Sequence, residues 1–176
     1  MNVAIIIGVV VLAIVVFIAM RPGKFRLSRS TTIQAPADPV FRLVNDFHEW
    51  TAWSPWEGLD PHMQRTYEGA NSGKNAGYRW EGNNKVGAGR MTIVESVPPE
   101  RVAIRLEFTR PMRATNRTTF TFVPKGLEAT DVTWSMEGNN GFMAKAFGLF
   151  MDMEKLVGKD FERGLDKLKA TAEAKR

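Results

Sequence analysis

The chain has 176 residues, of which 44% are hydrophobic and 24% are charged, and a formal net charge of +5. This amino-acid composition is close to that of ordinary globular proteins, so it argues against intrinsic disorder and against a polytopic membrane protein. The absence of cysteine excludes disulfide bonds, thiolate zinc sites and cysteine nucleophiles. Beyond an apolar N-terminal segment about 150 residues remain, which is enough for one domain with a buried core.

The first 20 residues are strongly apolar. No charged side chain occurs between Met1 and Met20, and 13 of the 16 residues from Val3 to Ile18 are Val, Ile, Leu or Phe. On an insertion scale such residues favour the bilayer by about 4–8 kcal/mol in total. The segment therefore predicts an uncleaved transmembrane helix over residues 1–20 in preference to a cleaved signal peptide, whose apolar region is nearer to about 7–15 residues.

Basic residues follow the apolar segment immediately, and no acidic residue precedes Asp38. They are Arg21, Lys24, Arg26 and Arg29. By the positive-inside rule, this asymmetry predicts a single-pass membrane protein whose domain is cytoplasmic and is joined by a basic linker over residues 21–25. Basic residues at this position favour contact with membrane lipids, so no nucleic-acid partner is expected.

The globular part opens with a strand pattern from Phe25 to Ile33 and a turn over residues 35–39. Asp38 is followed by a proline, which predicts that Asp38 is the N-cap of a helix with proline at its first position. Apolar residues then recur at helical spacing, which predicts one short helix to about Asn45 and a second around residues 47–52.

From Gln64 to Asn139 the apolar residues alternate with polar ones, which predicts antiparallel strands joined by turns. After Gly141 the apolar residues are again three and four positions apart. This spacing predicts one helix of roughly 25 residues that lies across the concave face of the sheet. Residues 171–176 are expected to form a polar tail.

Several segments carry a resemblance to a known family. They are residues 31–41 (TTIQAPADPVF), 46–56 (DFHEWTAWSPW), 78–83 (YRWEGN), 86–89 (VGAG), 132–136 (VTWSM) and 158–165 (GKDFERGL). Together with the order of elements, they make the chain resemble the SRPBCC (START and Bet v 1-like) superfamily, in particular its bacterial polyketide cyclase/dehydrase and lipid-transport group. The resemblance covers residues 26–169 and implies a helix-grip domain over residues 26–170. Such a domain is of the α+β class, with a curved antiparallel sheet of about seven strands wrapped around a long C-terminal helix, here preceded by the transmembrane helix.

The resemblance also implies a hydrophobic cavity between the sheet and the C-terminal helix. Independently, the inward-facing positions are rich in Trp, Phe and Met, which adapt to irregular apolar guests. The expected cavity-lining, ligand-binding residues are Trp80, Met91, Phe108, Trp134, Met136, Phe147, Phe150 and Met151. The same residues at the same spacing also fit a filled core.

Three tryptophans, Trp50, Trp53 and Trp56, fall within seven residues. This group could close the open end of the sheet, act as a gate on the cavity, or insert among lipid headgroups, which is a zone that Trp favours.

No catalytic constellation is recognisable, so catalytic residues stay unassigned. Only His48 and His62 could act as imidazole bases, and an Asp60–His62 pair lacks a nearby third metal ligand. Gly87-Ala88-Gly89 precedes a strand instead of opening a helix, so it cannot cradle a phosphate. No metal and no cofactor are therefore expected.

The sequence thus favours a membrane-tethered binding protein for a hydrophobic small molecule or lipid. One alternative is a cyclase- or hydrolase-type enzyme that acts on an apolar or aromatic substrate in the same cavity. The other is an interaction module with a filled core. Neither the ligand nor the oligomeric state is specified by the sequence.

Overall fold

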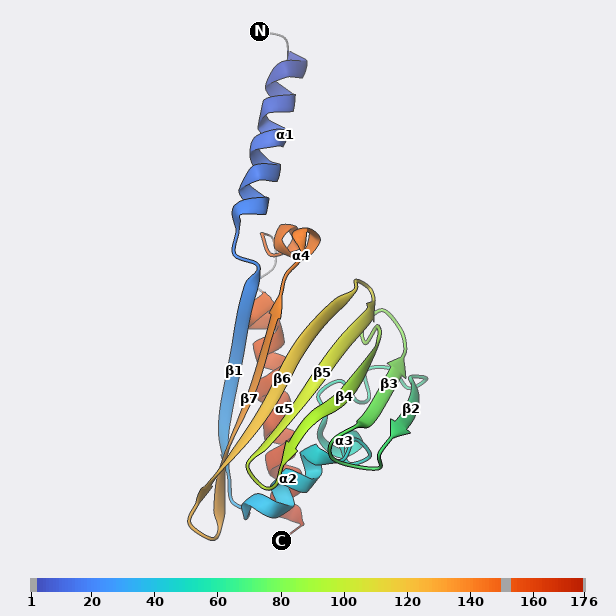
Figure 1. Cartoon of the computed structure of the whole chain (residues 1–176), viewed down its shortest axis with the longest axis vertical. Helices are drawn as coiled ribbons and strands as arrows, with labels where there is room; N and C mark the ends of the chain where they lie inside the picture. The colour runs from blue at the N-terminus through green and yellow to red at the C-terminus, as the bar shows by residue number, and fades with distance from the viewer. Residues whose placement is uncertain (1–2, 150–152, 176) are drawn as a thin grey trace.

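The structure is a computed structural model that describes residues 3–149 and 153–175 (Figure 1). Its elements are α1 (Val3–Met20), β1 (Lys24–Ile33), α2 (Ala37–Asn45), α3 (Trp50–Trp53), β2 (Gln64–Gly69), β3 (Ala76–Glu81), β4 (Ala88–Val97), β5 (Arg101–Arg110), β6 (Ala114–Lys125), β7 (Ala129–Asn139), α4 (Phe142–Phe147) and α5 (Met153–Ala174).

The seven strands form one sheet in the order β1-β7-β6-β5-β4-β3-β2, and every neighbouring pair is antiparallel. The sheet curves, and α5 lies along it in contact with β1, α2 and α3 (Figure 1). The predicted α+β helix-grip arrangement of sheet and C-terminal helix is therefore confirmed. The predicted domain limits of 26–170 stay a prediction.

Alternation along the strands separates the core from solvent. In β7, Val132, Trp134 and Met136 are buried, whereas Thr133 and Ser135 between them are only half-buried. This period of two is the geometry of a strand with one face against a core. It places the large aromatic residues of the sheet on the face that α2, α3 and α5 cover.

Two helix predictions need correction. The helix α2 begins at Ala37, so Pro36 is at the N-cap position and no side chain caps the helix. Asp38 lies inside the first turn, where its carboxylate faces the positive end of the helix dipole instead of capping an N–H group. The predicted single C-terminal helix is divided in two, because α4 ends at Phe147 and α5 begins at Met153.

The predicted membrane anchor is contradicted. Among the described residues, no helix combines the length and the apolar character that crossing a membrane requires. The predicted single-pass membrane localisation with a cytoplasmic domain was therefore wrong.

Candidate functional site

The described residues line a cavity of about 1470 Å³ between the concave face of the sheet, α4 and α5. Small-molecule sites in proteins typically occupy about 300–1,000 Å³, so the space is sufficient for a ligand of substantial size. Its walls come from strands β1 and β3–β7, from the segment that contains α3, and from both C-terminal helices.

Five of the residues expected at the cavity do line it. They are Trp80, Met91, Phe108, Trp134 and Met136. The side chain of Phe147 is not described, and Phe150 and Met151 lie outside the described residues. That these side chains bind a ligand stays a prediction.

Trp134 forms a fixed part of the wall. Its ring stacks on Phe161 of α5 at a centroid distance of 4.0 Å and on Phe120 at 4.7 Å. Its indole Nε1 donates a hydrogen bond of 2.8 Å to Thr118 Oγ1, whose hydroxyl donates in turn to the carbonyl of Ser135. Because its polar atom is satisfied within the sheet, the indole can remain buried beside the cavity without a ligand.

Trp80 is held in a similar way nearer the other edge of the sheet. Its Nε1 donates to the carbonyl oxygen of Val86 at 2.9 Å, and its ring meets the edge of Phe108 at 5.7 Å. The ring lies over Gly89 on the neighbouring strand, where a Cβ would come within 2.6 Å of Trp80 Cζ2. Glycine at position 89 therefore makes this position of the indole possible.

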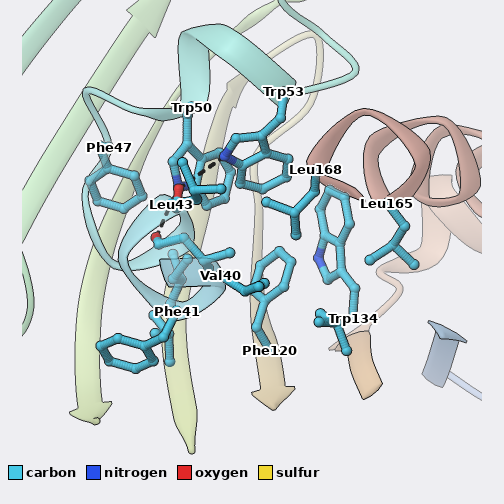
Figure 2. Packing of buried hydrophobic residues seen from close by; sticks show 14 of the residues in the cluster. Val40, Phe41, Leu43, Phe47, Trp50, Trp53, Phe120, Trp134, Leu165 and Leu168 are labelled. Carbon is cyan, nitrogen blue, oxygen red and sulfur yellow. Dashed lines mark hydrogen bonds between the residues drawn. The ribbon is translucent and has the colours of Figure 1, made fainter. Parts of the chain in front are cut away.

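The segment from Trp50 to Trp56, which we call the tryptophan segment, caps the C-terminal end of α2. The last four carbonyl groups of an α-helix have no partner within the helix. In α2 two of them are satisfied by indoles: Trp53 Nε1 donates to Leu43 O at 2.9 Å, and Trp50 Nε1 donates to Val44 O at 3.0 Å (Figure 2). A third, Asn45 O, accepts from the backbone N–H of Gly73 at 2.8 Å.

The three tryptophans have different environments. Trp53 is fully buried in the core, where it packs against Phe120 and Trp134 (Figure 2). Trp50 and the half-buried Trp56 line the cavity, and Trp53 does not. A gating role for this group stays a prediction.

A polar group that the sequence reasoning missed lies on the cavity wall. Glu57 forms an ion pair with Arg65, with 2.5 Å between Oε2 and Nη2, and accepts a hydrogen bond of 3.3 Å from the Tyr78 hydroxyl. Burial, followed by the charge of Glu57, raises the pKa of Tyr78 far above its ordinary value, so this hydroxyl stays protonated. The available signal was that Tyr78 shares the inward face of β3 with Trp80.

Neither histidine belongs to the Glu57–Arg65–Tyr78 group or lines the cavity. The exposed His48 stacks on Tyr67 at 4.0 Å and contacts Asp46 through Nδ1 at 2.7 Å, and it does not line the cavity. Asp60 accepts hydrogen bonds from the backbone N–H groups of Asn83 and His62, and these bonds lower its pKa. Asp60 therefore fixes the turn between β3 and β4, and the described residues contain no cluster that could hold a metal ion.

Comparison with known proteins identifies the family. The model of the polyketide cyclase / dehydrase and lipid transport family matches residues 24–173. The chain belongs to this family. The match agrees with the predicted SRPBCC resemblance and spans the sheet, the cavity and α5. No curated protein is significantly similar to the chain in sequence.

Solved structures share the fold of this family member at low identity. An NMR structure of a protein from Thermobifida fusca is 22% identical with a TM-score of 0.63, and the alignment covers 82% of this chain and 90% of the other. A START superfamily protein from Mycobacterium smegmatis is 19% identical with a TM-score of 0.58, covering 86% and 99%. The Zhui aromatase/cyclase from Streptomyces is 15% identical with a TM-score of 0.61, covering 85% and 96%. At such identities the likeness shows the fold alone.

In this family member the cavity opens at one end of the sheet. The register pairs Glu81 with Ala88, Phe108 with Ala114, and Lys24 with Asn139, so the β3–β4 turn, the β5–β6 turn and the start of β1 share the end nearest α4 (Figure 1). Exposed residues of these turns line the cavity together with residues of α4. We refer to this end, formed by residues 21–24, 84–87, 110–114 and 139–149, as the mouth.

Proposed function

We propose that this chain binds a hydrophobic small molecule or lipid in the cavity between the sheet and the C-terminal helices. The observation that carries the proposal is the cavity of about 1470 Å³ with its aromatic and methionine lining. Transfer of apolar surface from water into such a site is favourable by about 25 cal/mol per Å². The interaction-module alternative requires a filled core, and a cavity of this size argues against it.

The fixed positions of the lining residues also support binding. The indoles of Trp80 and Trp134 donate hydrogen bonds to Val86 and Thr118, so their orientation does not depend on a guest. A site that is ordered before its ligand arrives loses less side-chain entropy on binding. A preformed apolar cavity with few polar groups is the usual form of a small-molecule site.

Intrinsic fluorescence offers a direct test of binding. Four of the five tryptophans line the cavity, namely Trp50, Trp56, Trp80 and Trp134. Titration with decanol, which is neutral and apolar, should change their emission saturably. Native mass spectrometry of the purified full chain should in addition detect a copurified apolar molecule.

A variant that fills the cavity tests where the ligand lies. Leu106 is half-buried and lines the cavity, so Leu106→Trp should reduce the affinity for decanol about tenfold or more by occupying the space. Val123→Trp is the matched control, because Val123 is an exposed strand residue outside the lining. Decanol binding that is absent, or that Leu106→Trp leaves unchanged while the variant is folded, would overturn the proposal.

A second candidate function is an enzyme of the cyclase type acting on an apolar or aromatic substrate. The observation that favours it is the Tyr78 hydroxyl, which stays protonated on the cavity wall beside the carboxylate of Glu57. Such a neutral hydroxyl can donate a hydrogen bond to a substrate carbonyl and stabilise negative charge that develops on its oxygen. If the chain is an enzyme, a ligand copurified with Tyr78→Phe should differ in mass from the one copurified with the unchanged chain. Identical ligands would reject this candidate.

A further inference from the structure

The mouth of the cavity carries a concentration of basic side chains. Six of them line the cavity there: Arg21, Lys24, Lys85, Arg110, Arg113 and Lys145. They come from the linker between α1 and β1, the start of β1, the β3–β4 turn, the end of β5, the β5–β6 turn and α4. The topology therefore brings together cations that are far apart in the sequence.

The carboxylates that the structure describes do not neutralise this group. The two acidic residues on the lining are engaged elsewhere, Glu57 with Arg65 and Asp160 with Arg163. At the mouth, Arg110 contacts the exposed Glu81 at 3.4 Å, which is a weak pair in water. Among the side chains that the structure describes, no carboxylate pairs with the other five basic residues.

Among the residues that the structure describes, the partners of two of these cations are neutral. Arg21 donates to the carbonyl of Gly148 at 3.4 Å, and Lys145 donates to the carbonyl of Ala19 at 3.2 Å. These bonds join the end of α1 to α4 and position both side chains without cancelling their charge. Positive charge gathered around an opening with low-dielectric walls attracts anions more strongly than the same charge on an open surface.

On the outer face of the sheet, in contrast, basic residues do pair with carboxylates. There Glu68 pairs with Arg79 at 3.3 Å and with Arg90 at 3.0 Å. Both arginines on that face therefore have an acidic partner. The uncompensated charge at the mouth is therefore not a general consequence of the basic composition.

We infer that the cavity takes an amphiphile with an anionic head, such as a carboxylate, phosphate or sulfate, attached to an apolar body. This inference rests on the proposed binding function and specifies its ligand class. The apolar body contacts the Trp, Phe and Met lining, and the anionic group lies at the mouth among Lys85, Arg113 and Lys145.

The position of Glu57 fixes the direction of the ligand. Glu57 accepts a hydrogen bond from the hydroxyl of Tyr78. Tyr78 lies three residues before the end of β3, which is about 10 Å deeper than the mouth along the strand. Because Glu57 and Arg65 are paired with each other, neither offers an unpaired positive charge to an anionic head at that depth. The head therefore stays at the mouth while the apolar end enters.

Three amphiphiles with the same decyl chain test the inference: decanoate, decanol and decyltrimethylammonium. Each is titrated below its micelle concentration against the full chain, with tryptophan emission and calorimetry as readouts. We expect decanoate to bind at least tenfold more tightly than decanol, and decyltrimethylammonium to bind most weakly. The preference for decanoate should shrink in high salt, because the mouth is exposed to solvent.

A pair of double variants isolates the mouth. Lys85→Gln/Arg113→Gln should reduce the affinity for decanoate about fivefold or more, and should reduce decanol affinity much less. Arg42→Gln/Lys74→Gln removes one arginine and one lysine that are also exposed but lie outside the lining, and it should leave the decanoate preference intact.

The outcomes separate this inference from the proposed function. Equal affinity for decanoate and decanol, or equal effects of the two double variants, would overturn the anionic head while leaving apolar binding in place. Failure of all three amphiphiles would overturn both. Binding to vesicles of anionic phospholipid without saturable decanoate binding would also overturn the inference, because the cations would then serve a surface and not the cavity.

Discussion

Replacement of Trp53 by phenylalanine tests whether the tryptophan segment is part of the core. The indole of Trp53 is fully buried, and its Nε1 donates to Leu43 O at the C-terminal end of α2. Phenylalanine keeps an aromatic ring but has no N–H group. The change therefore leaves the Leu43 carbonyl without a partner and opens a small void in the aromatic cluster around Phe120.

The expected cost follows from these two effects. An unsatisfied buried carbonyl costs roughly 1–3 kcal/mol. The void left by the smaller ring adds roughly 1 kcal/mol. We therefore expect Trp53→Phe to lower the free energy of unfolding by about 2–4 kcal/mol, which for a chain of this size corresponds to a fall in Tm of roughly 4–16 °C.

Urea unfolding followed by circular dichroism measures this difference. Trp56→Phe is the matched control, because Trp56 is half-buried on the cavity wall and its indole donates no hydrogen bond among the described contacts. The control should lose less than about 1 kcal/mol, since no buried polar group is left without a partner. If the two variants were equally stable, the capping of α2 by the indole would be refuted.

Three further changes address other parts of the structure. Gly164→Ala should cost about 1–3 kcal/mol in urea unfolding, because its Cβ would lie 2.7 Å from Trp134 Cζ3, whereas Gly141→Ala, which meets nothing within 4 Å, should be nearly neutral. Burial raises the pKa of Tyr78 above its ordinary 10.0, so the stability of the chain should fall as the pH rises above about 10, and thermal melts of Tyr78→Phe should show a smaller fall. Backbone hydrogen bonds lower the pKa of Asp60 below 3.8, so stability should fall on acidification through about pH 4, and Asp60→Asn should be less stable at neutral pH and lose less on acidification; a parallel acid response of both chains would refute this.

The sheet could be predicted from the sequence because its pattern is local. Val132, Trp134 and Met136 alternate with polar residues, and that period alone determines which face is buried. The ends of the helices depend on weaker competing signals. Pro36 and Asp38 are two residues apart and either is compatible with a helix start, so the pattern did not decide between them.

The candidate site could be predicted only in part. Its aromatic lining follows from strand alternation, because residues such as Trp80 and Phe108 must share the concave face. The Glu57–Arg65–Tyr78 group does not follow, since Glu57 lies in a loop and Arg65 lies on the edge strand β2. The pairing of β2 with β3 brings Arg65 near Tyr78, and the loop before β2 adds Glu57. Neither the register of the strands nor the path of the loop can be read from one sequence.

The two ends of the sheet have opposite roles, and this difference accounts for the form of the cavity. At the end opposite α4, the helix α2 packs on β5, β6 and β7, and the indoles of Trp50 and Trp53 fix its last turn. That end is therefore closed by the same contacts that stabilise the fold. At the mouth, the turns contribute exposed cations such as Lys85 and Arg113 and few buried contacts. Substitutions at the mouth should consequently alter ligand preference with little loss of stability, whereas substitutions in the tryptophan segment should do the reverse.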